Sequence, residues 1–384
     1  MNAETVRVLF ALLRSAASGT MLSEAEKSLV TTEFLPQMMV VAKTHDVAHL
    51  LAYALRQNGL AADGVGEIEM MKAILRYEQL AYELESLCAV LESAGVDFLP
   101  LKGAVIREYY AEPWMRTSCD IDILVRREDL KKAIFALEEK LQYVKKEVGT
   151  HDVSLFSPSG NHIELHFDLV EEGIADSAIE LLASVWENVS VKGSWRHWYE
   201  MTDEYFYFYH IAHMAKHFSL GGCGIRSFLD AWLLERTETS DVSARDTLLS
   251  AGDLLAFAES VRKLSRVWFE GEAADELLLQ VQDFLLGGGT YGSTENRVAL
   301  HQGEKGGRVG YFFSRVFIPM DKLKKYYPIL EKQPYLMPAM QVRRWFMIFR
   351  PDVARMAKGE LKANGRMEKA RTEEMQKMLK NIGL

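Results

Sequence analysis

CDIDILV, residues 119–125, alternates polar and apolar side chains, as a half-buried β-strand does. Because alternate residues of a strand point to the same face, Asp120 and Asp122 project together while Ile121 and Ile123 pack the other way. Two adjacent carboxylates repel each other unless a cation lies between them, and Mg²⁺ prefers such hard oxygen ligands. The pair therefore predicts a divalent metal site, although two solvent-exposed acids on an edge strand would give the same pattern.

A second alternating stretch, HIELH at residues 162–166, follows the turn residues SPSG and predicts another strand. His162, Glu164 and His166 share one face of this strand, while the apolar residues between them face the core. If this strand pairs beside the first one, Glu164 supplies a third carboxylate to the metal site. We expect the His166 side chain to lie at the edge of the binding cleft around this metal site and to orient the carboxylate of Glu164.

The residues upstream of the first acidic strand suggest how phosphate is bound. VDFLPLKG, residues 96–103, is a short apolar run that predicts a strand entering a tight turn at Lys102 and Gly103. A glycine there lets the backbone approach phosphates, and the N-terminus of a following helix adds partial positive charge. Arg116, four residues before Asp120, is placed to neutralise phosphate oxygens. Lys102, Gly103 and Arg116 are therefore candidate nucleotide-binding residues.

The predicted strands are confined to the middle of the chain, since residues 1–95 and the residues after Asp176 show mostly helical spacing of apolar side chains. We predict an α+β protein with a small mixed β-sheet core at residues 96–200. An N-terminal helical region at 1–95 and a C-terminal helical region at 201–384 flank this core. Leu286–Gly310, rich in Gly, Ser and Thr, is expected to be a flexible loop.

Composition and charge set further bounds. The 384 residues are nearly half apolar and a quarter charged, a composition typical of a globular protein and not of a disordered or fibrous one, and the net charge is −9. From Gly303 to the C-terminus basic residues outnumber acidic ones by roughly ten, which indicates either solvated helix faces or a surface for a polyanion such as RNA or the phosphates of a nucleotide.

The cysteines and the apolar segments bear on the compartment. Cys88, Cys119 and Cys223 show neither zinc-ligand spacing nor a disulfide framework, which fits a reducing cytoplasm. VRVLFALL near the N-terminus is too short and too charged for a signal peptide. No stretch approaches the roughly 20 apolar residues that a membrane helix needs, so we expect a cytoplasmic protein with no membrane partner.

Taken together, LKG, DIDILV and HIELH occur in the order typical of the nucleotidyltransferase superfamily, whose core is shared with DNA polymerase β. The chain most closely resembles bacterial nucleotidyltransferases that read LKG, then Tyr and Pro, then Arg, then DIDLLV. Tyr110, Pro113 and Arg116 match that pattern. The likeness extends to His213, His217 and Asp230, and more weakly to YPIL and RRW in the C-terminal region.

This resemblance implies an activity. Asp120, Asp122 and Glu164 would hold two Mg²⁺ or Mn²⁺ ions, with a nucleoside triphosphate as substrate and pyrophosphate as product. The acceptor hydroxyl, on a small molecule, a protein or RNA, is not specified by the fold. One departure concerns the turn, because most of the superfamily carries Gly-Ser or Gly-Gly where this chain has Lys102 and Gly103. Lys102 is then expected to act on phosphate as a point charge.

Other interpretations remain open at this stage. The chain can be a catalytically silent relative that binds nucleotide without turnover, or a metal-dependent hydrolase that uses HxExH. His213 and His217 lie four apart, as on one helical face, but a zinc site needs a third ligand. We expect His217 to line the cleft and to contact phosphate or acceptor.

Overall fold

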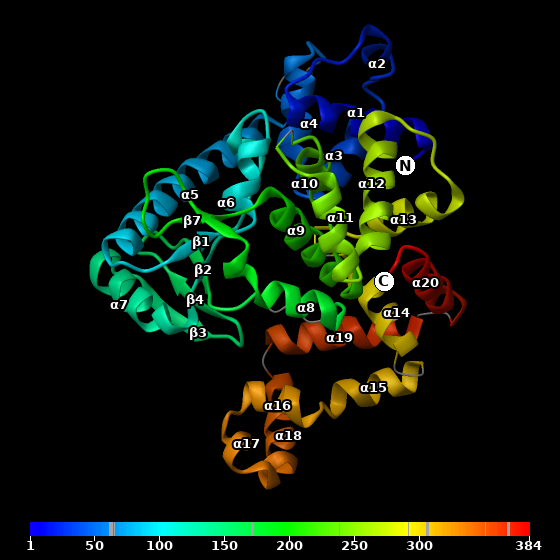
Figure 1. Cartoon of the computed structure of the whole chain (residues 1–384). Helices are drawn as coiled ribbons and strands as arrows, with labels where there is room; N and C mark the ends of the chain where they lie inside the picture. The colour runs from blue at the N-terminus through cyan, green and yellow to red at the C-terminus, as the bar shows by residue number, and fades with distance from the viewer. Residues whose placement is uncertain are drawn as a thin grey trace.

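The computed structural model covers the whole chain (Figure 1) and describes residues 1–60, 64, 66–169, 173–237, 239–290, 292–304, 307–349, 351–366 and 369–384. A five-stranded sheet lies beside a larger helical part, so the prediction of a small mixed sheet flanked by helices is confirmed.

The sheet has the order β1-β2-β5-β4-β3. Its strands are β1 (Phe98–Pro100), β2 (Asp120–Val125), β5 (His162–His166), β4 (Asp152–Phe156) and β3 (Val144–Val148). The central pair, β2 and β5, is parallel, whereas the other pairs are antiparallel. β2 and β5 fall in the two stretches whose alternation predicts strands, and β1 falls in the apolar run that precedes Lys102 and Gly103. A separate hairpin joins β6 (Val189–Val191) to β7 (Tyr199–Met201).

One face of the sheet is apolar and covered. Ile121 and Ile123 of β2 and Ile163 of β5 are buried in a cluster that also contains side chains of α5 (Glu67–Ser93) and α7 (Leu130–Leu141). In Figure 1 these two helices lie on the outer side of the sheet. The alternation of strand residues therefore turns Asp120, Asp122 and Glu164 toward the opposite face.

The opposite face looks toward the helical part. Leu124, on the same side of β2 as the two aspartates, belongs to the main helical core. In Figure 1, α8 (Asp176–Ala183) and α9 (Asp203–Ser219) lie between the sheet and most of the helical part. The acidic face of β2 and β5 is therefore bordered by helices rather than open to bulk water on all sides.

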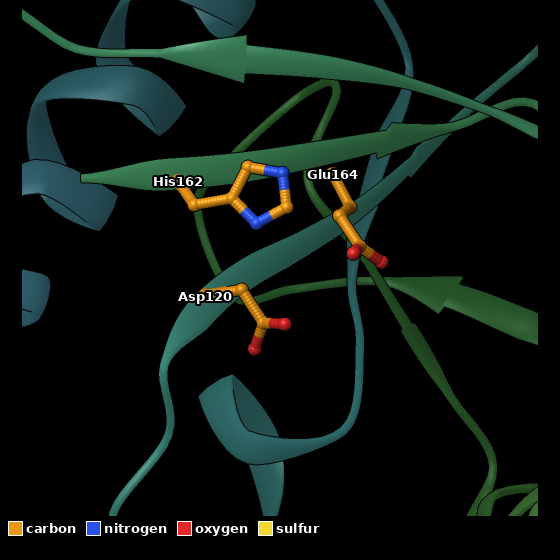
Figure 2. A group of neighbouring side chains, drawn as sticks. All are labelled: Asp120, His162 and Glu164. Atoms are coloured by element: carbon orange, nitrogen blue, oxygen red, sulfur yellow. The ribbon is translucent and has the colours of Figure 1, made fainter. Parts of the chain in front are cut away.

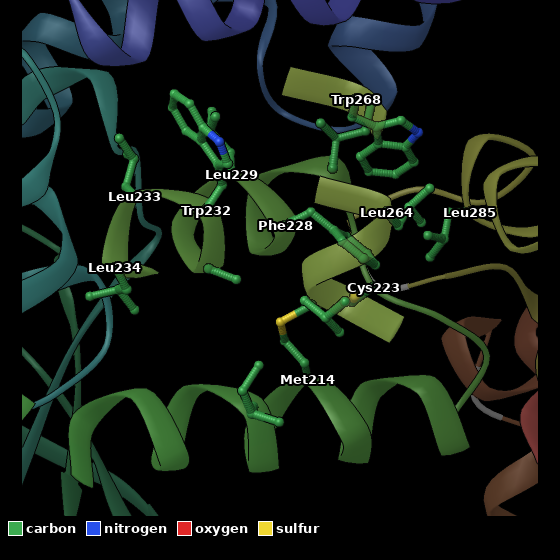
Figure 3. Packing of buried hydrophobic residues seen from close by; sticks show 14 of the residues in the cluster. Met214, Cys223, Phe228, Leu229, Trp232, Leu233, Leu234, Leu264, Trp268 and Leu285 are labelled. Atoms are coloured by element: carbon green, nitrogen blue, oxygen red, sulfur yellow. The ribbon is translucent and has the colours of Figure 1, made fainter. Parts of the chain in front are cut away.

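The main helical core joins α1, near the N-terminus, to helices that follow the sheet in the chain. Phe10 of α1 (Ala3–Ser18) stacks on Trp268 of α12 (Leu255–Glu270) with 4.2 Å between ring centroids. Figure 3 shows how Met214, Phe228 and Trp268 pack in this core. The remaining helices are α2 (Glu24–Ser28), α3 (Leu35–Thr44), α4 (Ala48–Gln57), α6 (Gly103–Ile106), α10 (Ile225–Glu235), α11 (Val242–Ala251), α13 (Glu276–Leu286), α14 (Thr294–Glu304), α15 (Arg308–Val316), α16 (Met320–Tyr326), α17 (Ile329–Lys332), α18 (Met337–Trp345), α19 (Pro351–Arg366) and α20 (Lys369–Asn381).

The expectation of a flexible loop over Leu286–Gly310 is wrong, because α14 and the start of α15 occupy most of it. Val298 and Ala299 of α14 are fully buried, so tertiary packing holds a helix that the glycine-rich flank obscures. No described helix is long and apolar enough to cross a membrane. The boundaries of the three regions at 95 and 200 stay predictions.

Candidate metal and nucleotide site

The parallel pairing of β2 with β5 brings the predicted acids together. In this register Asp120 lies opposite His162, and Asp122 lies opposite Glu164. Figure 2 shows Asp120, His162 and Glu164 projecting from the two adjacent strands on the same side of the sheet. One potential ligand atom from each of these three side chains lies within 4.8 Å of the other two. The same holds for Asp122, Glu164 and His166, so Glu164 belongs to both groups.

Asp122 already has two cationic partners. Lys102 Nζ lies 3.0 Å from Asp122 Oδ1, and His166 Nε2 lies 2.9 Å from the same oxygen. Burial opposes ionisation, but Lys102 and His166 hold the pKa of Asp122 well below its ordinary range. Burial also opposes the charged imidazole, yet hydrogen bonds to Asp122 and Glu164 raise the pKa of His166 to about 9. Asp122 is therefore a carboxylate balanced by this chain's own cations.

Asp120 differs from Asp122 although it is only two residues away. It is half-buried, and no lysine or histidine donates a hydrogen bond to it among the described contacts. Burial together with the charges of Asp122 and Glu164 raises the pKa of Asp120 above its ordinary value. A carboxylate repelled by two others is stabilised by a divalent cation, and the nearby imidazole of His162 adds a nitrogen donor. The donor set therefore fits a divalent ion such as Mg²⁺ or Mn²⁺.

Lys102 and Gly103 form the tight turn after β1 that the sequence predicts. The Ala104 amide donates to the Leu101 carbonyl oxygen at 3.1 Å, which closes the turn. A Cβ atom on Gly103 would approach Ser118 Cβ to 3.1 Å, so glycine permits a close contact with the segment before β2. The helix that follows, α6, has only four residues, so its N-terminus adds little partial charge. Lys102 remains the main positive group of this turn.

Arg116 is not directed at the acids of the sheet. Its Nε lies 2.9 Å from both carboxylate oxygens of Asp230 on α10, and an Nη nitrogen lies 2.8 Å from Oδ2. Tyr110 donates its hydroxyl to Asp230 Oδ1 at 2.6 Å. Asp230 is fully buried, and despite this burial Arg116 holds its pKa below the ordinary value. Three residues that carry the family resemblance thus form one buried cluster that ties the segment before β2 to the helical part.

His217 lies on α9, with its Nε2 atom 3.0 Å from Nε2 of His213. Within the described ranges of the chain, groups of three or more potential metal ligands occur only at the two clusters on β2 and β5. The two α9 histidines therefore do not form a zinc site with described residues.

α9 also lies near Lys102. Burial lowers the pKa of Lys102, but Asp122 and, after it, Tyr209 of α9 raise this pKa above its ordinary value. One turn of α9 thus borders the Lys102 side chain.

Arg76 of α5 supports the site although its place in an amphipathic helix gives no sign of this. It donates from Nη1 to Asn161 Oδ1 at 2.6 Å and from Nε to the Ser118 carbonyl oxygen at 3.4 Å. A further donor, Nη2, contacts the Cys119 carbonyl oxygen. These contacts join the residues that precede β2 to the residue that precedes β5. Arg76 therefore holds together the starts of the two strands, where Asp120 and His162 lie.

A turn with glycine after one strand, an Asp-x-Asp pair on the next and a third acid on its parallel neighbour define a nucleotidyltransferase-type core. Residues 36–270, more than half of the chain, match the model of a family described as "Uncharacterised nucleotidyltransferase". The chain belongs to this nucleotidyltransferase family. Comparisons with curated proteins and with solved structures found no match.

Proposed function

We propose that this protein transfers a nucleoside monophosphate from a nucleoside triphosphate to an acceptor hydroxyl and releases pyrophosphate. The observation that supports this most directly is the meeting of Asp120, Asp122 and Glu164 on two parallel strands. The two overlapping ligand groups, which share Glu164, support a two-metal version of the reaction with Mg²⁺ or Mn²⁺. Free cysteines at 88, 119 and 223 agree with a cytoplasmic setting.

Divalent ions, when bound, neutralise triphosphate oxygens and lower the pKa of the acceptor hydroxyl. Glu164, half-buried between the two ligand groups, accepts the proton of that hydroxyl. The acceptor oxygen then forms a bond with the α-phosphorus, and the bond from that phosphorus to the α–β bridging oxygen breaks. Lys102 binds the departing phosphates as a point charge. Most of the rate arises from positioning and charge neutralisation.

The test is a screen with the four triphosphates, each labelled at the α-phosphate, against cell extract, with pyrophosphate release measured in parallel. We expect label transfer that needs Mg²⁺ or Mn²⁺ and is lost in Asp120→Asn, Asp122→Asn and Glu164→Gln. Glu138→Gln, an exposed acid on α7 across the sheet, is the matched control and should keep the activity. Activity that survives the three site substitutions would rule out this mechanism.

Two observations favour other candidate functions. Asp122 is already paired with Lys102 and His166, which opposes metal binding at that carboxylate and would suit a protein that binds nucleotide without turnover. Calorimetric binding of a triphosphate together with no pyrophosphate release would support that relative. Each ligand group also includes a histidine, which suits the metal of a hydrolase. Tightly held zinc or iron in the purified protein would support the hydrolase over exchangeable Mg²⁺.

A further inference from the structure

Lys102 occupies a backbone position that normally belongs to glycine. Its φ of 44° and ψ of −117° place it in the left-handed half of the dihedral map, in a turn closed by the Ala104 amide. A side chain that remains in such a conformation strains the backbone, and strain of this kind gathers at functional sites. The turn is held in place because the Leu101 amide donates to the Asp122 carbonyl oxygen at 3.0 Å.

The strained turn aims the lysine at one of the two ligand groups. Lys102 Nζ lies 3.0 Å from Asp122 Oδ1, an oxygen of the group formed by Asp122, Glu164 and His166. A divalent ion bound to that oxygen would meet the ammonium at close range in a mostly buried environment, where like charges repel strongly. The other group, with Asp120 and His162, has no lysine donating to it among the described contacts.

The two ligand groups therefore differ in their need for a cation. Lys102 and His166 both lie within hydrogen-bonding distance of Asp122, whereas among the described contacts no lysine or histidine donates to Asp120, whose carboxylate lies close to that of Glu164. The Lys102 side chain is 24% exposed, so part of its flexible stem is accessible to solvent and to a ligand. A triphosphate carries several negative charges and competes with the single charge of Asp122 for the ammonium.

We propose that Lys102 is a resident cation that keeps a divalent ion out of the Asp122–Glu164–His166 group until a triphosphate draws its ammonium away. This inference rests on the proposed nucleotide substrate. The Asp120–His162–Glu164 group binds its ion without nucleotide, and the second ion enters only together with the triphosphate. Lys102 thus makes assembly of the two-ion site depend on substrate.

The experiment counts Mn²⁺ bound to metal-free protein by electron paramagnetic resonance. We expect one Mn²⁺ per wild-type chain without nucleotide and two with a non-hydrolysable triphosphate analogue. The pair should show the spin coupling of ions about 3.5–4 Å apart. Lys102→Met should bind the coupled pair without any nucleotide. Lys131→Met, an exposed lysine on α7, is the matched control and should bind one ion as wild type does.

A second variant protects the test against misfolding. Lys102→Gly removes the ammonium and also relieves the strained backbone, so it should fold if Lys102→Met does not, and it should likewise bind two ions. A wild-type chain that binds two ions without nucleotide, or Lys102 variants that still bind one, would overturn the inference. The count needs no turnover, so an inactive protein with the expected counts would contradict the proposed transfer reaction while leaving the role of Lys102 standing.

Discussion

Lys102 Nζ and Asp122 Oδ1 lie 3.0 Å apart, although the two residues are separated by 20 positions in the chain. The contact joins the turn after β1 to the middle of β2. It also makes the two aspartates of the Asp-x-Asp pair different, because Asp122 is paired directly with Lys102, whereas among the described residues no such ion pair forms at Asp120. Replacing Asp120 or Asp122 by Asn should therefore change the free energy of unfolding of the metal-free protein by different amounts.

We expect Asp122→Asn to destabilise the metal-free protein by about 3 kcal/mol, because it leaves the buried Lys102 and His166 cations facing each other without their counter-charge. Asp120→Asn should change the stability by less than about 0.5 kcal/mol or raise it, because it removes a repelled carboxylate. Urea unfolding in a chelator measures both values. Equal losses for the two variants would contradict this assignment of charges.

His166 should make the stability of the metal-free protein depend on pH. Hydrogen bonds to Asp122 and Glu164 outweigh burial and raise its pKa from 6.5 to about 9 on folding. A group whose pKa rises on folding stabilises fully below the unfolded-state value, and this contribution disappears as pH rises through the folded-state value. The free energy of unfolding in chelator should therefore fall from about pH 6.5 to about pH 9. His166→Gln should flatten this slope, and an unchanged slope would show that another group titrates.

The acids of the site could be predicted because a strand has a period of two, so CDIDILV and HIELH each define their polar face without knowledge of the fold. Their partners could not be predicted in the same way. No local pattern in the sequence predicts that β2 and β5 are parallel neighbours. Nor does one predict the register, in which Asp122 lies opposite Glu164 and not opposite a residue next to it. The dihedral angles of Lys102 are likewise set by the closed turn and not by the lysine itself.

Arg116 shows a second limit of sequence reasoning. Its spacing before Asp120 favours a phosphate ligand, and its partner Asp230 lies 114 positions away on α10. Long-range ion pairs leave no periodic pattern. The loop predicted at Leu286–Gly310 failed for a related reason, since burial of Val298 and Ala299 against other elements outweighs the local glycine signal.

Arg76 should act on metal binding through the backbone ends that it holds. Arg76→Met removes the donors to Asn161 Oδ1 and to the Ser118 carbonyl oxygen, which loosens the starts of β2 and β5. We expect Mn²⁺ affinity to fall about 10- to 100-fold, the size usually found when groups that orient ligands are lost. Titration followed by electron paramagnetic resonance gives the affinity, with Arg266→Met, in an exposed ion pair with Glu272, as the control. An unchanged Mn²⁺ affinity in Arg76→Met would limit this arginine to a structural role.

The buried cluster of Arg116, Asp230 and Tyr110 leads to a prediction that separates structure from phosphate binding. Asp230→Ala should destabilise the protein by about 3–5 kcal/mol, because the guanidinium of Arg116 is left buried without its counter-charge. Tyr110→Phe should cost about 1–2 kcal/mol, since Asp230 keeps its arginine. Urea unfolding measures both losses.

A double substitution sharpens this test. Replacing the pair together, as Arg116→Met with Asp230→Leu, should cost less than either single change, because no uncompensated charge stays buried. If the double variant also keeps the wild-type KM for the triphosphate, Arg116 serves the fold through Asp230. A raised KM in a variant of restored stability would instead show that Arg116 contacts phosphate, as its position four residues before Asp120 predicts.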